Sequence, residues 1–219
     1  QTERLQGLLK TRLAQLYKQT SSPKIGYLYA RVLQKEHLFE QAIAVANEVL
    51  ITEPKHSNSH LLLANIHMVQ GQFLQAKQHC IALISHVSTI TASTCVLDVQ
   101  SQHQDLLQSY QALIKIINNK PTNLDTQHVL SEMSYRLGNY KQALSHLQSV
   151  DLVNAPVSLI VLWADIQLAL AQHTDVLNTL SALLPDKNNL EDAILLRLAI
   201  AEKKLNKTGK KWQNLMAQR

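Results

Sequence analysis

The side chains best suited to metal chemistry are the ten histidines of this 219-residue chain. His60 and His67 lie seven residues apart. That spacing puts them on one face of a helix but separates them by about 10 Å of rise, too far to share an ion unaided. His56, His79 and His86 are nearby in the sequence and could join them only through tertiary packing. The sequence therefore predicts scattered polar histidines and no metal site.

No catalytic motif occurs in the chain. It contains no metal-binding helix of the HExxH type, no glycine-rich phosphate loop and no GxSxG nucleophile turn. Each of these motifs brings a nucleophile, a base or a phosphate cradle to a fixed place, and without one no residue is a candidate for catalysis. We expect a protein that is not an enzyme and that uses no cofactor.

The elements that position the remaining functional side chains are predicted to be helices. The composition is 46% hydrophobic and 17% charged, with five glycines and five prolines. Few turn formers and many helix-compatible residues are typical of an all-α chain. No run of about 18 or more apolar residues occurs, so we expect no transmembrane segment. Gln1 is not a start methionine, and we expect a processed or excised chain.

The net charge of +5 is concentrated at the carboxyl end. Residues 202–219 contain six basic residues and one acidic residue, so the rest of the chain is balanced. A nucleic-acid-binding protein usually spreads its basic residues over a working face. We therefore expect no nucleic-acid partner, and a solvated terminal face on which Trp212 covers the last helices. The alternative is a basic adaptor that docks through its C-terminal helix on an anionic membrane surface or on nucleic acid.

Two segments, 60–76 and 127–143, repeat the same order of residue types. Each has an apolar residue followed by a small one, and then a glycine, an aromatic residue and an alanine at matching positions. These residues are Leu63, Ala64, Gly71, Phe73 and Ala76 in the first segment and Leu130, Ser131, Gly138, Tyr140 and Ala143 in the second. The matching spacing indicates an internal repeat.

The spacing predicts a hairpin of two amphipathic helices in each segment. Gly71 and Gly138 are expected to end first helices in a left-handed conformation, which glycine adopts without steric cost. Ala76 and Ala143 are expected to be buried where the paired helices cross closely. Farther along the second helix, a buried apolar stripe is expected at Cys80, Leu83 and Ile84 in the first segment and at Leu147 and Val150 in the second.

These positions resemble the signature of tetratricopeptide repeat proteins, which is about 34 residues long. The resemblance covers nearly the whole chain, and residues 1–22 are either a capping helix or a truncated repeat. His37 and Ala171 stand at the glycine position, and Trp163 is expected in the core. The approximate repeats are 23–56, 57–89, 90–123, 124–156, 157–188 and 189–219. The resemblance implies an all-α fold, a right-handed superhelical solenoid of antiparallel helix hairpins.

The third repeat is the weakest match to the signature. Its first helix, expected within residues 88–104, is rich in Ser, Thr and Gln and contains β-branched residues. These residue types have middling helix propensity. We therefore expect a short or irregular helix there and a local change in superhelix curvature.

The resemblance implies that the first helices line a concave groove that binds a segment of another protein. The protein is thus predicted to be an interaction module or assembly scaffold, and self-association into a homo-oligomer is left open. A carboxylate clamp for an acidic chaperone tail is not predicted, because only Asn65 has the chemistry that such a clamp needs. The expected groove residues are Lys24, Tyr27, Arg31, Asn58, Asn65, His128, Glu132, Tyr135, Arg136 and Asp165.

Cys80 and Cys95 are the two cysteines of the chain, and the repeat pattern places them in neighbouring helices. With a turn near residues 87–90, residues whose numbers sum to about 176 lie level with each other, and this pair meets that condition. Level placement is necessary for a disulfide but not sufficient, because the Cβ atoms must also converge. A bridge and two reduced thiols both fit the sequence. A bridge would indicate an oxidising compartment, which in a bacterium is the periplasm, and we favour that location over the cytoplasm.

Overall fold

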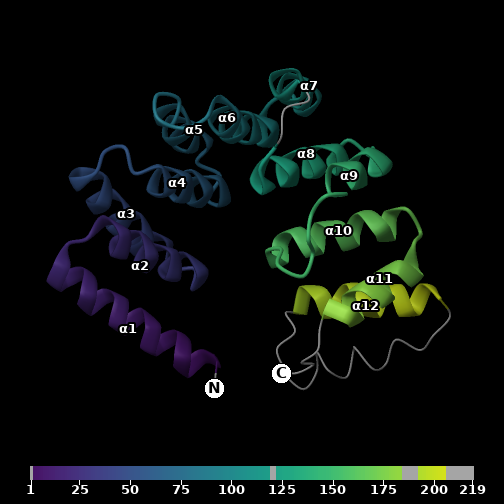
Figure 1. The fold of residues 1–219 in the computed structure, drawn as a ribbon, viewed down its shortest axis with the longest axis horizontal. Coiled ribbons are helices and arrows are strands. Elements are labelled where there is room, and N and C mark those ends of the chain that lie inside the picture. Colours follow the sequence, from purple (N-terminus) through teal and green to yellow (C-terminus); the bar gives the residue numbers. More distant parts are fainter. Residues whose placement is uncertain (1, 119–121, 184–191, 206–219) are drawn as a thin grey trace. The chain divides into compact units, whose positions relative to one another are not determined.

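The structure, a computed structural model, describes residues 2–118, 122–183 and 192–205. This part of the chain consists of twelve α-helices and contains no β-strand (Figure 1). The prediction of an all-α fold is therefore confirmed. The chain divides into two compact units, unit 1 (Gln1–Lys120) and unit 2 (Pro121–Arg219).

Unit 1 is a stack of helical hairpins preceded by one helix. Its helices are α1 (Thr2–Thr20), α2 (Pro23–Lys35), α3 (Phe39–Thr52), α4 (Ser57–Val69), α5 (Phe73–Ala82), α6 (Thr89–His103) and α7 (Leu106–Ile117). The hairpins are α2/α3, α4/α5 and α6/α7, and successive hairpins pack through α3 against α4 and α5 against α6 (Figure 1). Each hairpin thus buries its apolar stripe partly against its neighbour.

Helix α1 packs against α2 at a glycine that leaves no room for a side chain. Gly26 is buried in α2, and a Cβ atom built on it would lie 2.6 Å from a ring carbon of Tyr17 in α1 and 2.6 Å from a methyl carbon of Val49 in α3. Both distances are far below van der Waals contact, so only glycine permits this approach. Gly26 therefore allows α1 to pack closely against the first hairpin.

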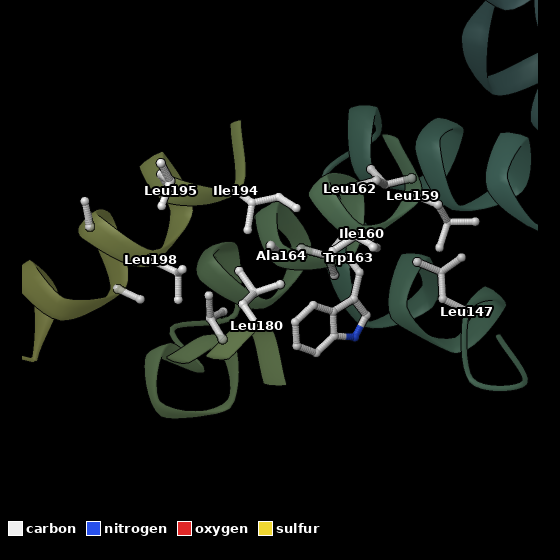
Figure 2. Packing of buried hydrophobic residues seen from close by; sticks show 14 of the residues in the cluster. Leu147, Leu159, Ile160, Leu162, Trp163, Ala164, Leu180, Ile194, Leu195 and Leu198 are labelled. Carbon is white, nitrogen blue, oxygen red and sulfur yellow. The ribbon is translucent and has the colours of Figure 1, made fainter. Parts of the chain in front are cut away.

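Unit 2 contains two further hairpins and a last described helix. Its helices are α8 (Leu124–Arg136), α9 (Tyr140–His146), α10 (Val157–Ala169), α11 (His173–Leu183) and α12 (Asp192–Lys204). Helix α10 packs against α9, α11 and α12 and carries much of one apolar cluster. Trp163 is 8% exposed and lies among the side chains of this cluster, as Figure 2 shows. Its predicted place in the core is confirmed.

Four hairpins turn in the same way, and the left-handed conformation predicted for Gly71 and Gly138 is confirmed. The residues His37, Gly71, Gly138 and Ala171 each have a φ between 58° and 77°. Each lies two residues beyond the last helical residue, and its N–H and the next N–H donate to carbonyls three and five residues back. This is a Schellman motif, whose left-handed residue is usually glycine. Ala76 and Ala143 are fully buried, as predicted.

Two expectations about the hairpins are wrong. Helix α6 is a regular helix of 15 residues, longer than the 13 of α4. It is capped by Ser88, whose hydroxyl accepts from the N–H of Thr91 at 3.2 Å, and it buries Ala92 and Val99. Capping and tertiary packing here outweigh middling propensity. Ile84 lies beyond the end of α5 and is 62% exposed, because the chain turns before the apolar stripe reaches it.

The basic carboxyl-terminal segment lies largely outside the described residues. Of the six basic residues counted there, Lys203 and Lys204 are at the end of α12 and are exposed. The other four, and Trp212, are outside the described residues. Within the part that is described, no helix combines the length and the apolar character needed to cross a membrane.

Candidate partner-binding surface

Helix α2 presents an aromatic and basic surface in unit 1. Lys24 and Arg31 are exposed, and Tyr27 between them is half-buried. The Arg31 guanidinium lies 5.8 Å from the centre of the Tyr27 ring, within cation–π range. The Tyr27 ring also lies near that of His56, with the ring centres 5.6 Å apart. Three of the predicted groove residues therefore share one face of α2.

The same surface continues onto α4. The Gln34 side chain donates from Nε2 to Oδ1 of Asn65 at 2.7 Å, which joins α2 to the next first helix along the chain. Asn58, near the start of α4, is exposed. The structure thus brings the five predicted groove residues of unit 1 to first helices that lie next to each other.

A cavity of about 480 Å³ opens between α1 and α2, beside Arg31. It is lined by four apolar residues and three charged ones: Leu9, Leu13, Leu28, Val32, Arg31, Lys35 and Glu36. Leu9 is 52% exposed and Leu28 is 39% exposed, so its apolar wall is open to water. Glu36 is paired with Lys10 of α1. The sequence did not reveal this cavity, although the leucines of residues 1–22 mark an apolar face.

Unit 2 carries the other predicted groove residues. His128, Glu132 and Tyr135 lie on α8 and are half-buried, and Arg136 beside them is exposed. The Tyr135 ring centre is 5.5 Å from that of Tyr140. Burial, and after it the nearby Asp165 and Tyr140, raise the pKa of the Tyr135 phenol above its ordinary value.

Asp165 is engaged within unit 2 rather than free. Nε and Nη2 of Arg197 donate to its two carboxylate oxygens at 2.9 and 2.7 Å, in the paired geometry typical of strong Arg–carboxylate contacts. Arg197 is thus a surface residue that sequence reasoning missed. The two residues are 32 apart and Gln34 and Asn65 are 31 apart, each close to one repeat. Complementary side chains about one repeat apart were the signal that could have found the Arg197 pair.

The cysteines predicted to be neighbours are bonded to each other in the structure. Cys80 of α5 and Cys95 of α6 form a disulfide, with their Cα atoms 5.4 Å apart. The bridge joins the second hairpin of unit 1 to the third. Cys80 is fully buried, so the cross-link lies inside the stack.

The histidines are not scattered as the sequence suggested. His60, His67, His79 and His86 lie together on the α4/α5 hairpin, because pairing of the two helices brings residues 19 apart into contact. Helical spacing within one helix could not show this. Among the described residues, no group of three or more His, Cys, Asp or Glu side chains is arranged to hold a metal ion.

The described helices have the fold of a helical hairpin repeat protein. No protein-family model matches the chain, and no curated protein matches it. Among solved structures it is similar to PilW, described as a widely conserved type IV pilus biogenesis factor, with 15% identity and a TM-score of 0.62 over 90% of this chain and 91% of PilW. It is also similar to a tetratricopeptide repeat protein from Parabacteroides merdae, with 13% identity and a TM-score of 0.51 over 95% of this chain and 90% of that one. At these identities the likeness shows the fold.

Proposed function

We propose that this protein is a non-catalytic interaction module that binds a segment of a partner protein on unit 1. The surface proposed is the exposed face of α2 together with the cavity between α1 and α2. One observation carries the proposal: an apolar wall that includes Leu9 and Leu28 stands open to water beside the guanidinium of Arg31. A tetratricopeptide-type fold supports such an interaction or scaffold role in general.

The chemistry of the surface indicates the chemistry of the partner. Covering exposed leucines gains about 25 cal/mol for each Å² of apolar surface removed from water, so the cavity favours an apolar side chain. Arg31 and Lys35 at its edge are exposed. The one carboxylate among the lining residues, Glu36, is already paired with Lys10. The surface therefore suits a segment in which an apolar residue is flanked by Asp or Glu.

The other predicted groove residues remain part of the proposal as additional contacts. Asn58 and Asn65 would extend the unit 1 surface along α4 with hydrogen-bonding side chains. In unit 2, Tyr135 and Asp165 would contribute half-buried polar contacts. The Asp165 carboxylate already accepts hydrogen bonds from Arg197. Further contacts proposed on the same grounds are Lys24, Tyr27, His128, Glu132 and Arg136.

A peptide library displayed on phage tests the proposal with no partner chosen in advance. We expect selection on the wild-type protein to enrich peptides with an apolar residue next to acidic ones. Arg31→Glu and Leu28→Asp should each weaken the binding of a synthetic enriched peptide at least tenfold, about 1.4 kcal/mol, measured by calorimetry. Tyr27→Ala should weaken it less, because the tyrosine supports Arg31 from one side.

Matched controls are available on the same unit. Lys55→Glu reverses the charge of an exposed residue and matches Arg31→Glu. Ile51→Asp replaces an apolar residue that is 80% exposed and matches Leu28→Asp. Neither position lines the cavity, so both variants should bind the peptide as the wild type does. Enriched peptides that bind the Arg31→Glu and Leu28→Asp variants unchanged would contradict the proposed surface.

The disulfide suggests a cellular setting for this function. Because disulfides persist in oxidising compartments, we infer that the protein works in one, which in a bacterium is the periplasm. PilW is described as a pilus biogenesis factor, so protein components of type IV pilus assembly are the first natural partners to test. Thiol titration of the protein isolated from its source, unfolded without reductant, should find no free thiol. Two free thiols would remove the inference about the compartment.

A further inference from the structure

Four histidines meet in the α4/α5 hairpin. His60 and His67 come from α4, His79 comes from α5, and His86 comes from the turn that follows α5. The ring centre of His79 is 5.4 Å from that of His60 and 5.5 Å from that of His67. The ring centres of His60 and His86 are 6.1 Å apart. His60 is only 8% exposed, so the cluster is partly inside the hairpin.

The hydrogen bonds of His60 define its neutral form. Its Nε2 lies 3.0 Å from the carbonyl oxygen of Pro54, which can only accept, so Nε2 carries a proton. In neutral His60 the Nδ1 atom is then the acceptor. The Nδ1 atom of His79, 3.1 Å away, donates to it. A second proton on His60 would set two N–H groups against each other and break this contact.

Among the described groups that shift the pKa of His79, none is negatively charged. The titratable groups that act on His79 are His60 and His67, and His86 faces His60. The segment before α4 contributes the carbonyl of Pro54. Within the described residues, no carboxylate bonds to any of the four rings.

Burial adds to the effect of the missing counter-charge. Nε2 of His86 is buried with no hydrogen-bond partner among the described residues, so a proton there would have no acceptor. Burial, and then the charges of His60 and His67, lower the pKa of His79 from 6.5 to about 4. In an opened hairpin the His79 ring would be solvated and would take up a proton near the ordinary histidine pKa.

We propose that this cluster makes the α4/α5 hairpin acid-labile: neutral imidazoles hold the hairpin closed, and uptake of protons opens it in mildly acidic surroundings. The opening follows from the contacts between the rings and does not depend on any partner. Helix α4 also carries Asn58 and Asn65, so a partner bound there would be released on acidification. That consequence alone rests on the proposed function.

Amide hydrogen exchange tests the opening directly, without a partner. Protection factors, corrected for intrinsic exchange, are measured for the oxidised full chain between about pH 7.5 and pH 5, with a chelator present so that bound metal plays no part. Uptake of one proton on opening lowers protection by up to tenfold per pH unit below about pH 6.5. We expect this fall in α4 and α5 and a smaller one in α10, which itself contains no histidine but packs against α9, where His146 lies. A fall of less than about twofold in α4 and α5 would overturn the proposal.

Variants of His79 test whether the pH-dependent opening of the hairpin is caused by the histidine cluster. His79→Gln keeps a hydrogen-bonding side chain but cannot titrate, and it should flatten the pH dependence of protection in α4 and α5. His79→Phe fills the same place with a ring that takes no proton and serves if the glutamine variant folds poorly. The matched control is His37→Asn, at an exposed position whose left-handed backbone asparagine tolerates. A wild-type pH dependence in both His79 variants would also overturn the proposal.

Discussion

The hairpins α4/α5 in unit 1 and α8/α9 in unit 2 follow one repeat pattern but contain different chemistry. His79 and His146 are at the same repeat position, and burial lowers the pKa of both. In unit 1 three other histidines surround that position. In unit 2, Gln127 stands where unit 1 has His60, and it donates to the Ser149 hydroxyl at 3.0 Å. The pattern therefore sets the backbone, while residues outside the pattern decide what the hairpin can do.

The residue that follows each of these two histidines extends the contrast. Cys80 and Leu147 are also equivalent in the repeat. Cys80 cross-links its hairpin to α6, whereas Leu147 packs into the apolar cluster around α10. One repeat position thus holds successive hairpins together by a covalent bond in unit 1 and by hydrophobic burial in unit 2.

Breaking the disulfide is expected to have the largest effect and to be confined to unit 1. The bridge spans 15 residues of sequence. A loop of that length restricts the unfolded chain by about 3 kcal/mol. Replacing both cysteines by alanine, or adding reductant to the wild type, should lower the free energy of opening by about that amount in α5 and α6. Hydrogen exchange measures it helix by helix, with α10 as the reference. Unchanged protection in α6 after reduction would show that packing alone holds the two hairpins together.

Overpacking the helix crossings should cost about 1 to 3 kcal/mol in each unit. Ala76 and Ala143 are both fully buried, and leucine at either position has no space. We expect Ala143→Leu to cost more, because the Ser131 hydroxyl also donates to the Ala143 carbonyl at 2.9 Å and would be displaced. Thermal unfolding compares the two variants. Equal costs would mean that this hydrogen bond contributes little, and no cost in either would contradict the repeat register.

The two equivalent histidines should differ in how they respond to pH. A histidine whose pKa is lowered in the folded state binds fewer protons than it does when unfolded, so its unit loses stability as pH falls below about 6.5. For His79 the loss grows until the folded pKa of about 4 is reached. The slope cannot exceed about 1.4 kcal/mol per pH unit for one proton. Burial lowers the pKa of His146, whereas the charges of His60 and His67 add to burial at His79, so we expect a narrower pH range of lost stability for His146. NMR titration of the two rings measures both pKa values, and an equal pKa would rule out an effect of the neighbouring rings.

The repeat register could be predicted from the sequence because it depends on local backbone geometry. The left-handed residue after each first helix shows this best. At Gly71 and Gly138 the residue type itself indicates a left-handed turn. At His37 and Ala171 the residue type does not indicate one, and the turn is predicted from the constant spacing of the repeat. The buried alanines follow from the same register. Residues that act on their own chain neighbours are therefore well predicted.

Contacts between helices could not be predicted in the same way. The histidine cluster depends on which faces of α4 and α5 meet, and the cavity beside Arg31 depends on how closely α1 approaches α2 at Gly26. Helix α6 was misjudged because propensity was weighed without its cap and its buried face. Arg197 was missed because no single-helix pattern connects it to Asp165. Each of these features is set by which helix faces pack together, and the spacing of residues within one helix does not describe that. The cysteines are the exception, because the expected turn placed them level with each other in neighbouring helices.

The smallest expected effect concerns the turns without glycine, and it compares the units once more. Ala171 has a φ of 58°, a conformation that costs a residue with a Cβ about 1 to 2 kcal/mol. Ala171→Gly removes that strain, but it also increases the conformational entropy of the unfolded chain, which offsets roughly 0.5 to 1 kcal/mol of the gain. We therefore expect the free energy of unfolding of unit 2 to rise by about 0.5 kcal/mol. His37→Gly removes the same strain in unit 1 but also the edge contact of the His37 ring with Phe39, whose ring centre is 5.6 Å away. Its gain should therefore be smaller. Chemical denaturation of both variants decides the matter, and a loss of stability in Ala171→Gly would show that the turn is not strained.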